Sequence, residues 1–462
     1  MKNLKNNIFF KIGIIACLIF VLMIPTTLIQ DLIHEREDIQ QRATREVSQK
    51  WGTGQVVTGP FLSIPYDRYE KQYSPKDSTH KLVKIRNWAH FLPEKLDING
   101  AISPEKRYRG IYEVVVYESK LDISGNFDAL DFKALEIDPE NVLFEKATLN
   151  FGINGLKGIE KQVVVDWNGN KVFFDSGVAT NHIVSSGINA VVPLQKKDTE
   201  IKYNFETTID LKGSQFLYFN PVGKTTNVTI TSDWQTPSFT GTYLPDERTV
   251  SEEGFTSNWN ILHLNRNYPQ QWKSRNYKIN DSEFGTDLLL PVDSYKKSYR
   301  VGRYAILFLA LTFLTFFFVE VMRKVFIHPI QYLLVGLALV VFYVLLLSFS
   351  EHMMFNIAYI ISTILTLSLI SLYTTAILKS KQVGLLIFSI LLLMYTFIFT
   401  IIQLQDYALL IGSLGMFSIL SVVMYFSRKI DWYSIKLGNQ NPPEPNHPPV
   451  ITTVPPPPKN EE

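Results

Sequence analysis

The chain has 462 residues, 46% of them hydrophobic and 19% charged, and its formal net charge is +2. This balance offers no basic field for nucleic acid and no acidic excess for a cationic substrate. The single cysteine, Cys17, excludes an intrachain disulfide and a cluster of thiolate metal ligands. Because Cys17 lies inside the first apolar run, we expect its side chain to be buried and chemically inert.

Six nearly charge-free runs are long enough to cross a bilayer as helices, which takes roughly 20 apolar residues. They cover residues 12–29, 304–321, 330–349, 355–378, 383–402 and 407–426. We interpret the first run as an uncleaved anchor, since bulky Leu28 and Ile29 close it and no small-residue cleavage site follows. The pattern predicts one N-terminal and five C-terminal transmembrane helices in a lipid bilayer.

Basic residues beside these runs set the expected orientation. They lie before the first run, after the second, after the fourth and after the sixth: Lys2, Lys5, Lys11, Arg323, Lys324, Lys379, Lys381, Arg428 and Lys429. The loops at the opposite end, 350–354 and 403–406, contain no Lys or Arg. By the positive-inside rule, we expect both termini to be cytoplasmic and residues 30–303 to be translocated across the membrane.

The translocated region begins as a helix and continues as strands. Residues 30–54 have apolar side chains mostly four apart, which predicts a helical stalk that ends at Gly52 and Gly54. Residues 55–303 show apolar and polar side chains in alternation, which is typical of half-buried strands. Asn168-Gly169 lies between two apolar runs and predicts a tight hairpin. Further strands are expected at 190–194, 201–211 and 227–232.

These patterns predict a membrane protein of the α+β class, with a large, mainly antiparallel β domain between the first helix and the other five. A sandwich or a pair of packed sheets suits such a domain. Residues 1–11 form the cytoplasmic N-terminus. Residues 427–462 are rich in proline and predict a disordered cytoplasmic tail, because polyproline II structure builds no core.

A search for catalytic and metal-binding motifs finds none. There is no P-loop, G-x-S-x-G, H-E-x-x-H or C-x-x-C motif, and the eight histidines are too far apart in sequence for a standard metal site. We therefore expect a protein that is not an enzyme and that uses no cofactor.

Charged residues within or beside membrane helices are costly and often functional. Glu320 lies three and four positions before Arg323 and Lys324, so we expect a local ion pair there.

Glu351 and His352 follow the third run, and Asp406 lies in the loop at the same outer edge. With Ser350 they could form a cluster, but hydrolysis would require His352 to activate Ser350, and adjacent helical residues point in different directions. Contact with the β domain is therefore the preferred interpretation. An outer-leaflet enzyme that uses Glu351 and His352 is one alternative.

The fourth run is rich in hydroxyl groups, which spread around most of the helix: Ser362, Thr363, Thr366, Ser368, Ser371, Thr374 and Thr375. They are interpreted as small residues that permit close helix packing and interhelical hydrogen bonds. A transporter or transport accessory protein is the other alternative, although neither broken helices nor an internal repeat is visible.

Several segments together resemble the CreD family of bacterial inner-membrane proteins. The most specific is HPIQYLLVGLALVVFYVLLLSFSEH (328–352) followed by FNIAY (355–359). The others occur in order along the chain: TGPFLSIPY (58–66), RYRGIY (107–112), NPVGKTTNVTITSDWQTPSFTGTYLP (220–245), QDYALLIGSLGMF (405–417) and RKIDWY (428–433). Gln235, Thr236 and the proline-rich tail depart from the family pattern.

The resemblance implies a multi-pass protein of the Gram-negative inner membrane that supports envelope integrity and stress tolerance. CreD-like proteins are associated with a two-component response to envelope or nutrient conditions and have no established catalytic activity. The implied partners are envelope proteins or cell-wall components, in addition to the bilayer.

Two of the family-like segments contain further candidate functional residues. Arg107 and Arg109 share one face of a predicted strand, with a kink permitted at Gly110, and we expect them to pair with acidic neighbours rather than with anionic headgroups. Trp234 opens an aromatic run punctuated by proline and glycine, which predicts an ordered loop packed on the sheet or against the membrane-side helices. A peptide or glycan groove at Trp234 is the alternative.

Overall fold

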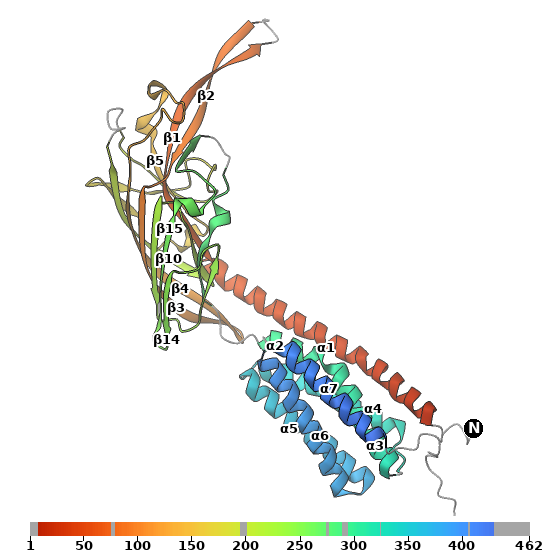
Figure 1. Ribbon diagram of the computed structural model, residues 1–462. Helices are drawn as coiled ribbons and strands as arrows, with labels where there is room; N and C mark the ends of the chain where they lie inside the picture. Colours follow the sequence, from red (N-terminus) through yellow and green to blue (C-terminus); the bar gives the residue numbers. More distant parts are fainter. Residues whose placement is uncertain are drawn as a thin grey trace, which may run out of the picture. The chain divides into compact units, whose positions relative to one another are not determined.

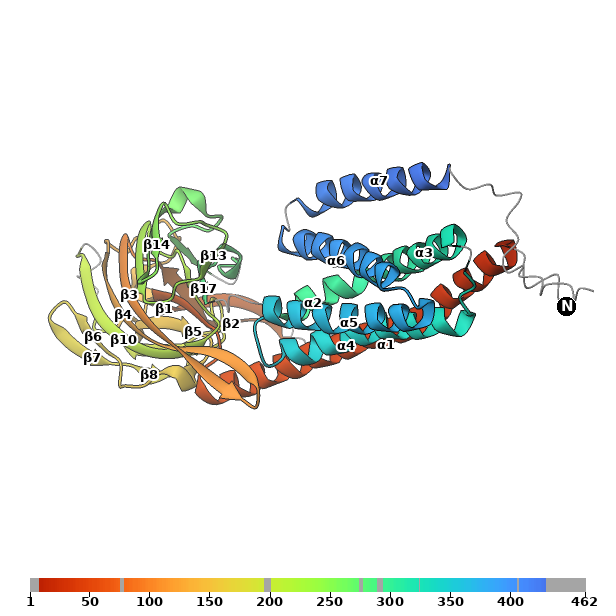
Figure 2. The ribbon, with the colours of Figure 1, turned by 90° about the horizontal axis from the view of Figure 1, so that it is seen from below.

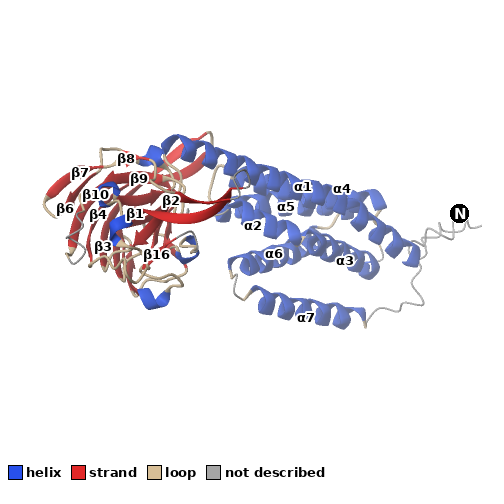
Figure 3. Cartoon of the chain, turned by 90° about the horizontal axis from the view of Figure 1, so that it is seen from above, coloured by secondary structure: helices blue, strands red, loops and turns tan. Residues whose placement is uncertain are grey.

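The computed structural model describes residues 8–74, 79–194, 201–273, 277–288, 294–323, 325–404 and 407–428. The chain forms two compact units, which are described separately. The helical unit comprises Met1–Glu35 and Ser294–Glu462, and the β domain comprises Arg36–Asp293. Figure 3 shows this division between helices and strands. The predicted α+β class, in which apolar helices precede and follow a strand-rich region in the sequence, is confirmed.

Helix α1 (Ile8–Trp51) is one continuous helix that contains both the predicted anchor and the predicted stalk. Pro25 lies inside it, and the hydroxyl of Thr26 donates to the Met23 carbonyl at 2.7 Å. The helix ends before Gly52, where an added Cβ would stand 2.6 Å from the Lys212 carbonyl oxygen. Cys17 is exposed on the surface of the helical unit, so the expectation that it is buried was wrong.

The helical unit also contains α2 (Ser294–Arg303), α3 (Ala305–Arg323), α4 (Pro329–Ser350), α5 (Phe355–Leu378), α6 (Lys381–Gln403) and α7 (Ala408–Ser427). Six helices in the described part of the chain, α1 and α3–α7, are long and apolar enough to cross a membrane. Helix α2 was not predicted. The sequence had assigned its residues to the β-rich region, because the mostly polar segment SYKKSYRVGR lacks an apolar run.

The helices of this unit differ in how much of their surface the protein itself covers. In the most apolar 18-residue stretch of each helix, half of the residues are buried in α3 and in α4, whereas none are buried in α7 (Ala408–Ser427). Figure 2 shows α7 beside α6 and apart from the other helices of the unit. The core of the unit is therefore formed by α3–α6, together with one stripe of α1.

Leu22 marks the position where α1 packs on this core. Leu22 and Ile33 are each 1% exposed, whereas Phe20, which lies on another face of α1, is 72% exposed. A Cβ added at Gly336 on α4 would overlap the Leu22 side chain, so the bare glycine surface accommodates Leu22. Small residues at such contacts allow helices to approach closely in membranes.

The β domain consists of two sheets. The first has the strand order β13-β17-β11-β1-β5-β9-β8, with β2 paired to β1 and β16 paired to β2. Its strands are β13 (Pro237–Gly241), β17 (Phe284–Leu288), β11 (Phe216–Asn220), β1 (Gln55–Ser74), β5 (Thr148–Ile153), β9 (Gly187–Val191), β8 (Asp175–Ser176), β2 (Thr79–Phe91) and β16 (Gln271–Lys273).

The second sheet has the order β14-β15-β12-β3-β4-β10-β6-β7. Its strands are β14 (Glu247–Ser251), β15 (Gly254–Leu262), β12 (Thr225–Ser232), β3 (Lys95–Arg109), β4 (Tyr112–Phe127), β10 (Tyr203–Ser214), β6 (Val164–Trp167) and β7 (Asn170–Phe173). The pairs β1–β11 and β3–β12 are parallel, and the other described strand pairs are antiparallel. The predicted hairpin at Asn168-Gly169 is confirmed, since Trp167 pairs with Asn170.

One hydrophobic core lies between the two sheets. Along β10, buried and exposed residues alternate from Tyr203 to Leu211, as the strand pattern predicts. The largest side chains that are less than 2% exposed include Phe61, Tyr117, Trp167 and Trp259, from both sheets. Each buried side chain of this size stabilises the domain by roughly 2 to 3 kcal/mol.

The outer parts of β1 and β2 form a two-stranded arm, which extends beyond the sheet in Figure 1. Where the arm leaves the sheet, the carboxylate of Asp67 pairs with Lys84 at 2.7 Å and with Arg86 at 3.3 Å. The Lys84 and Arg86 side chains lower the pKa of Asp67 below its usual value, Lys84 having the larger effect.

Candidate functional site

The first candidate cluster lies where α4 ends. Glu351 follows the last residue of α4, and its carboxylate accepts a hydrogen bond of 3.2 Å from the hydroxyl of Tyr295 on α2. The His352 side chain is exposed. The Ser350 hydroxyl donates to the Leu347 carbonyl at 2.9 Å rather than to His352. The fourth predicted member, Asp406, lies outside the described residues.

Polar side chains continue from Glu351 across the same end of the helical unit. The Lys297 ammonium on α2 donates to the Gln403 side chain of α6 at 3.4 Å. The Gln403 amide in turn donates to Asn356 of α5 at 2.6 Å. These side chains form a hydrogen-bonded polar rim, which links α2, α5 and α6.

At the opposite end of the helical unit, Lys11 of α1 and Glu320 of α3 form an ion pair. Their side chains are 6% and 1% exposed. The Tyr332 hydroxyl on α4 donates to the second carboxylate oxygen of Glu320 at 2.9 Å, and Lys11 also donates to the Ile327 carbonyl at 2.7 Å. Three helices thus meet at one buried carboxylate.

This contact corrects the expected pairing of Glu320 with its sequence neighbours. Arg323 shows no ion pair with Glu320 among the described residues, and Lys324 lies outside them. Helix α3 ends at Arg323, three residues after Glu320, whereas α1 brings Lys11 to the carboxylate. A Lys directly before one apolar run and a Glu near the end of another, both on the side expected to be cytoplasmic, provide the sequence signal for such a pair.

Arg107 and Arg109 lie beside the last turns of α1, within the β domain. Arg109 pairs with Glu46 of α1 at 3.1 Å, and Arg107 pairs with Glu105. Gly110, with φ of +62°, lies in the tight turn between β3 and β4 instead of at a kink within a strand. The acidic pairing expected for both arginines is present.

Trp51, the last residue of α1, is held between two cations. The Arg107 guanidinium lies 4.5 Å from its ring centroid and the Lys212 ammonium lies 4.4 Å from it. The indole N–H donates to the Tyr117 carbonyl at 3.3 Å. Cation–π contacts and this hydrogen bond fix the end of α1 to β3, β4 and β10.

The segment that begins at Trp234 was predicted to be a loop. This prediction was wrong in part, because Pro237–Gly241 forms the edge strand β13. Trp234 is partly buried and packs on the hydrophobic core. The Phe239 ring contacts the Phe255 ring with centroids 5.6 Å apart. Trp234 and Phe239 therefore serve as packing groups on the core of the β domain.

A polar row that was not predicted lies inside the first sheet. The hydroxyl of Ser63 on β1 and Nδ1 of His90 on β2 are 3.0 Å apart, and Nε2 of His90 lies 3.2 Å from Nδ1 of His182. Burial, with a smaller contribution from His182, lowers the pKa of His90 to about 3, so its imidazole is neutral at pH 7. The sequence did not predict this row, because Ser63 and His90 meet only through the register in which β1 pairs with β2.

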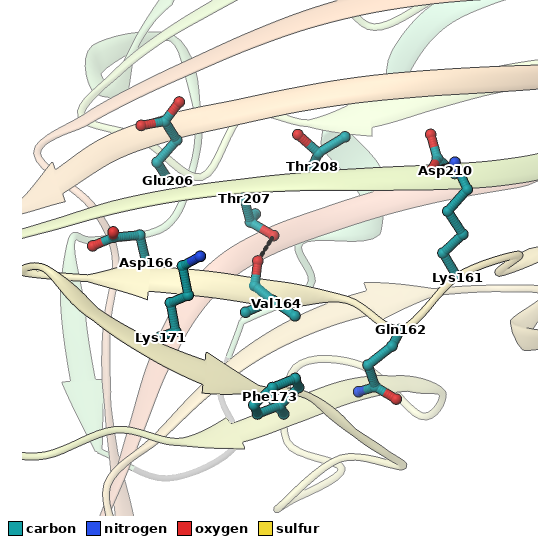
Figure 4. A pocket seen from close by; sticks show the side chains of 10 residues that line it. All are labelled: Lys161, Gln162, Val164, Asp166, Lys171, Phe173, Glu206, Thr207, Thr208 and Asp210. Atoms are coloured by element: carbon teal, nitrogen blue, oxygen red, sulfur yellow. Dashed lines mark hydrogen bonds and ion pairs between the residues drawn. The ribbon is translucent and has the colours of Figure 1, made fainter.

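The outer face of the second sheet contains a groove of about 670 Å³, shown in Figure 4. Its lining side chains come from β6, β7 and β10 and the segment before β6: Lys161, Gln162, Val164, Asp166, Lys171, Phe173, Glu206, Thr207, Thr208 and Asp210. Phe173 is 63% exposed, and Lys161 pairs with Asp210 at 2.7 Å. An exposed ring among charged and hydroxyl groups suits the binding of a polar polymer or peptide.

Both units are covered by one known family. The profile of the family described as Inner membrane protein CreD matches residues 7–433. The chain belongs to the CreD family. Inner membrane protein CreD of Escherichia coli (strain K12) is similar to it, with 31% identity over 440 residues, covering 94% of this chain and 96% of that relative.

The CreD match extends over α1, the β domain and α3–α7, so the helical unit and the β domain are both parts of the CreD architecture. The predicted family is therefore confirmed, as is the inner-membrane, multi-pass character of the chain. Among the residues that the structure describes, no group of three His, Cys, Asp or Glu side chains could hold a metal ion.

Proposed function

We propose that this CreD-family protein supports cell-envelope integrity and stress tolerance without catalysis, with its β domain in the periplasm as the surface that contacts envelope proteins or cell-wall components. The observation that carries the proposal is the continuous helix α1 (Ile8–Trp51), which has specific polar contacts at each end. One end is the Lys11–Glu320 pair in the helical unit, and the other is Trp51 in the β domain.

The contacts of Lys11 support a cytoplasmic position for both termini. Because Lys11 donates to the Ile327 carbonyl, the start of α1 and the connection between α3 and α4 lie at one end of the helical unit. That connection follows Arg323, the last residue of α3, and positive charge is concentrated on the cytoplasmic side of membrane helices. The β domain, which follows α1, would then be periplasmic.

The groove around Phe173 is the proposed contact surface of the β domain. Phe173, which is 63% exposed, provides the apolar part of a groove that is otherwise lined mainly by charged and polar side chains. Lys171 and Gln162 flank the ring and provide hydrogen-bond donors for a polar ligand.

The test is complementation of a deletion strain, scored as sensitivity to detergent and to cell-wall antibiotics. We expect Phe173→Ser with Lys171→Glu to lose most of the rescue at wild-type protein level. The matched control is Leu264→Ser, because Leu264 is 80% exposed on the β domain but lies outside the groove. Full rescue by the groove variant would remove the groove from the proposal.

A further inference from the structure

Four helices of the helical unit, α3–α6, surround a cluster of buried aromatic rings. The Tyr395 ring on α6 lies 4.4 Å from the Phe308 ring on α3 and 4.8 Å from the Phe342 ring on α4. The Tyr359 hydroxyl on α5 donates to the Tyr395 carbonyl at 2.8 Å. These contacts place one residue from each of the four helices at the same level of the core.

Five buried hydroxyl groups in this core have no hydrogen-bond partner in the part of the chain that the structure describes. They belong to Thr312, Tyr343, Ser362, Thr363 and Tyr395. None of these residues is more than 6% exposed. The five groups therefore cannot be satisfied by water at the surface of the unit.

Helix periodicity brings these hydroxyls together. Thr312 follows Phe308 by four residues on α3, and Ser362 and Thr363 follow Tyr359 by three and four residues on α5. Residues with this spacing share one face of a helix. The three hydroxyls thus lie one turn beyond the aromatic cluster, and Tyr343 and Tyr395 lie within it.

Other hydroxyl groups of the same unit behave differently. Thr315, Thr374 and Thr375 each donate to the carbonyl four residues earlier, at 2.7 to 2.8 Å. This bond is available to any helical Ser or Thr. Thr312 and Ser362 do not use it, so their hydroxyls are oriented toward the core instead of toward their own helix.

A buried hydroxyl without a partner is as unfavourable as a lost hydrogen bond, and five in one core would be a severe defect. Buried water commonly satisfies such groups, because one molecule makes about three hydrogen bonds. We propose that the hydroxyls of Thr312, Tyr343, Ser362, Thr363 and Tyr395 form an internal site that binds water in the α3–α6 core. The resulting polar site lies inside an otherwise apolar bundle.

The polar rim near Glu351 lies on the Tyr359 side of the proposed site. The Lys297 ammonium lies 5.6 Å from the Phe355 ring centroid, and the Phe355 ring lies 6.1 Å from that of Tyr359. Toward the other end, the Phe313 ring packs edge-on against the Tyr332 ring at 5.5 Å.

Cysteine accessibility tests the proposal in the full-length protein. In a Cys17→Ser background, which removes the single native thiol, Ser362→Cys replaces a hydroxyl in the site. The matched control is Leu367→Cys, because Leu367 is 1% exposed on the same helix. The probe is the water-borne reagent methanethiosulfonate ethylammonium, which reacts with thiolate.

We expect Ser362→Cys to react about tenfold faster than Leu367→Cys, since only a hydrated thiol ionises readily. Equal rates would overturn the proposal. Thr363→Cys provides the same comparison if Ser362→Cys does not fold. In addition, Ser362→Ala is expected to lower the melting temperature, because bound water loses a partner, whereas a rise would show that the hydroxyl was unsatisfied in a dry core.

Discussion

Lys11 and Glu320 lie 309 positions apart in sequence and form an ion pair that is nearly inaccessible to solvent. Taking both charges out of water is costly, and the loss is offset only when hydrogen bonds satisfy the remaining polar atoms. Tyr332 and the backbone of Ile327 provide these bonds. The pair therefore specifies where α1 docks on α3 and α4.

Removing one partner of this pair should be much worse than removing both. Lys11→Met or Glu320→Gln alone is expected to destabilise the helical unit by about 3 to 5 kcal/mol, because a buried charge or acceptor is left unpaired. The double variant should recover most of that loss. The measurement is thermal unfolding of the purified protein in detergent. Lys50→Met is the control, since Lys50 is 75% exposed in its pair with Glu46, and additive losses in the double variant would contradict the account.

A second prediction concerns the contact between Leu22 and Gly336. Gly336→Leu should displace α1, because the position of the new side chain is already occupied by Leu22 and by the Phe313 ring. Overpacking of this kind typically costs about 1 to 3 kcal/mol. Leu22→Ala in the same chain should restore part of the melting temperature. If Gly336→Leu alone leaves the melting temperature unchanged, α1 does not pack on α4 through Leu22.

A third prediction follows from the neutral His90. Its pKa of about 3 in the folded domain lies below its usual 6.5, so the unfolded chain binds the proton more readily between these values. The stabilisation is complete above pH 6.5 and is lost as the pH falls toward 3. We expect a loss of about 2 to 3 kcal/mol between pH 7 and pH 4.5, measured by thermal unfolding.

His90→Gln should flatten this pH dependence, while His263→Gln should leave it intact, since His263 lies outside the row that contains Ser63 and His182. The Asp67 carboxylate titrates below this window, because its pKa is lowered. An equally steep loss of stability in His90→Gln would show that another group causes it.

A fourth prediction concerns the end of α1 in the β domain. Trp51→Ala removes two cation–π contacts and one hydrogen bond, worth about 2 kcal/mol together. Trypsin cleavage after Arg42 or Arg45 should accelerate by roughly tenfold or more, because the helix end opens more often. Arg109→Ala removes only an exposed pair with Glu46 and should have a smaller effect. Equal rates for wild type and Trp51→Ala would contradict this role of Trp51.

The local features of this fold could be predicted from the sequence, because their causes are local. An apolar run of sufficient length specifies a membrane helix, and Asn168-Gly169 specifies a tight turn through positive φ at both residues. Helix α2 (Ser294–Arg303) was missed because it is short and amphipathic. Its buried side chains, such as Tyr295 and Val301, are separated by charged ones.

The contacts of the candidate sites depend on packing between distant segments, which no single-sequence pattern encodes. Glu320 has two nearby cations in sequence, yet it pairs with Lys11 on another helix. Ser63 and His90 meet only because β1 and β2 pair in one register. Glu351, by contrast, was identified correctly as a residue at a helix end, although its partner Tyr295 belongs to the helix that was missed.

The most direct test of the central claim is envelope integrity in a deletion strain that expresses Glu351→Gln with His352→Ala at wild-type level. Sensitivity to detergent and to cell-wall antibiotics is the measurement. The account predicts full rescue, because an interaction protein does not require these side chains for chemistry. Failure to rescue by a folded, membrane-inserted double variant would contradict the non-catalytic account and make the α4 end the functional site.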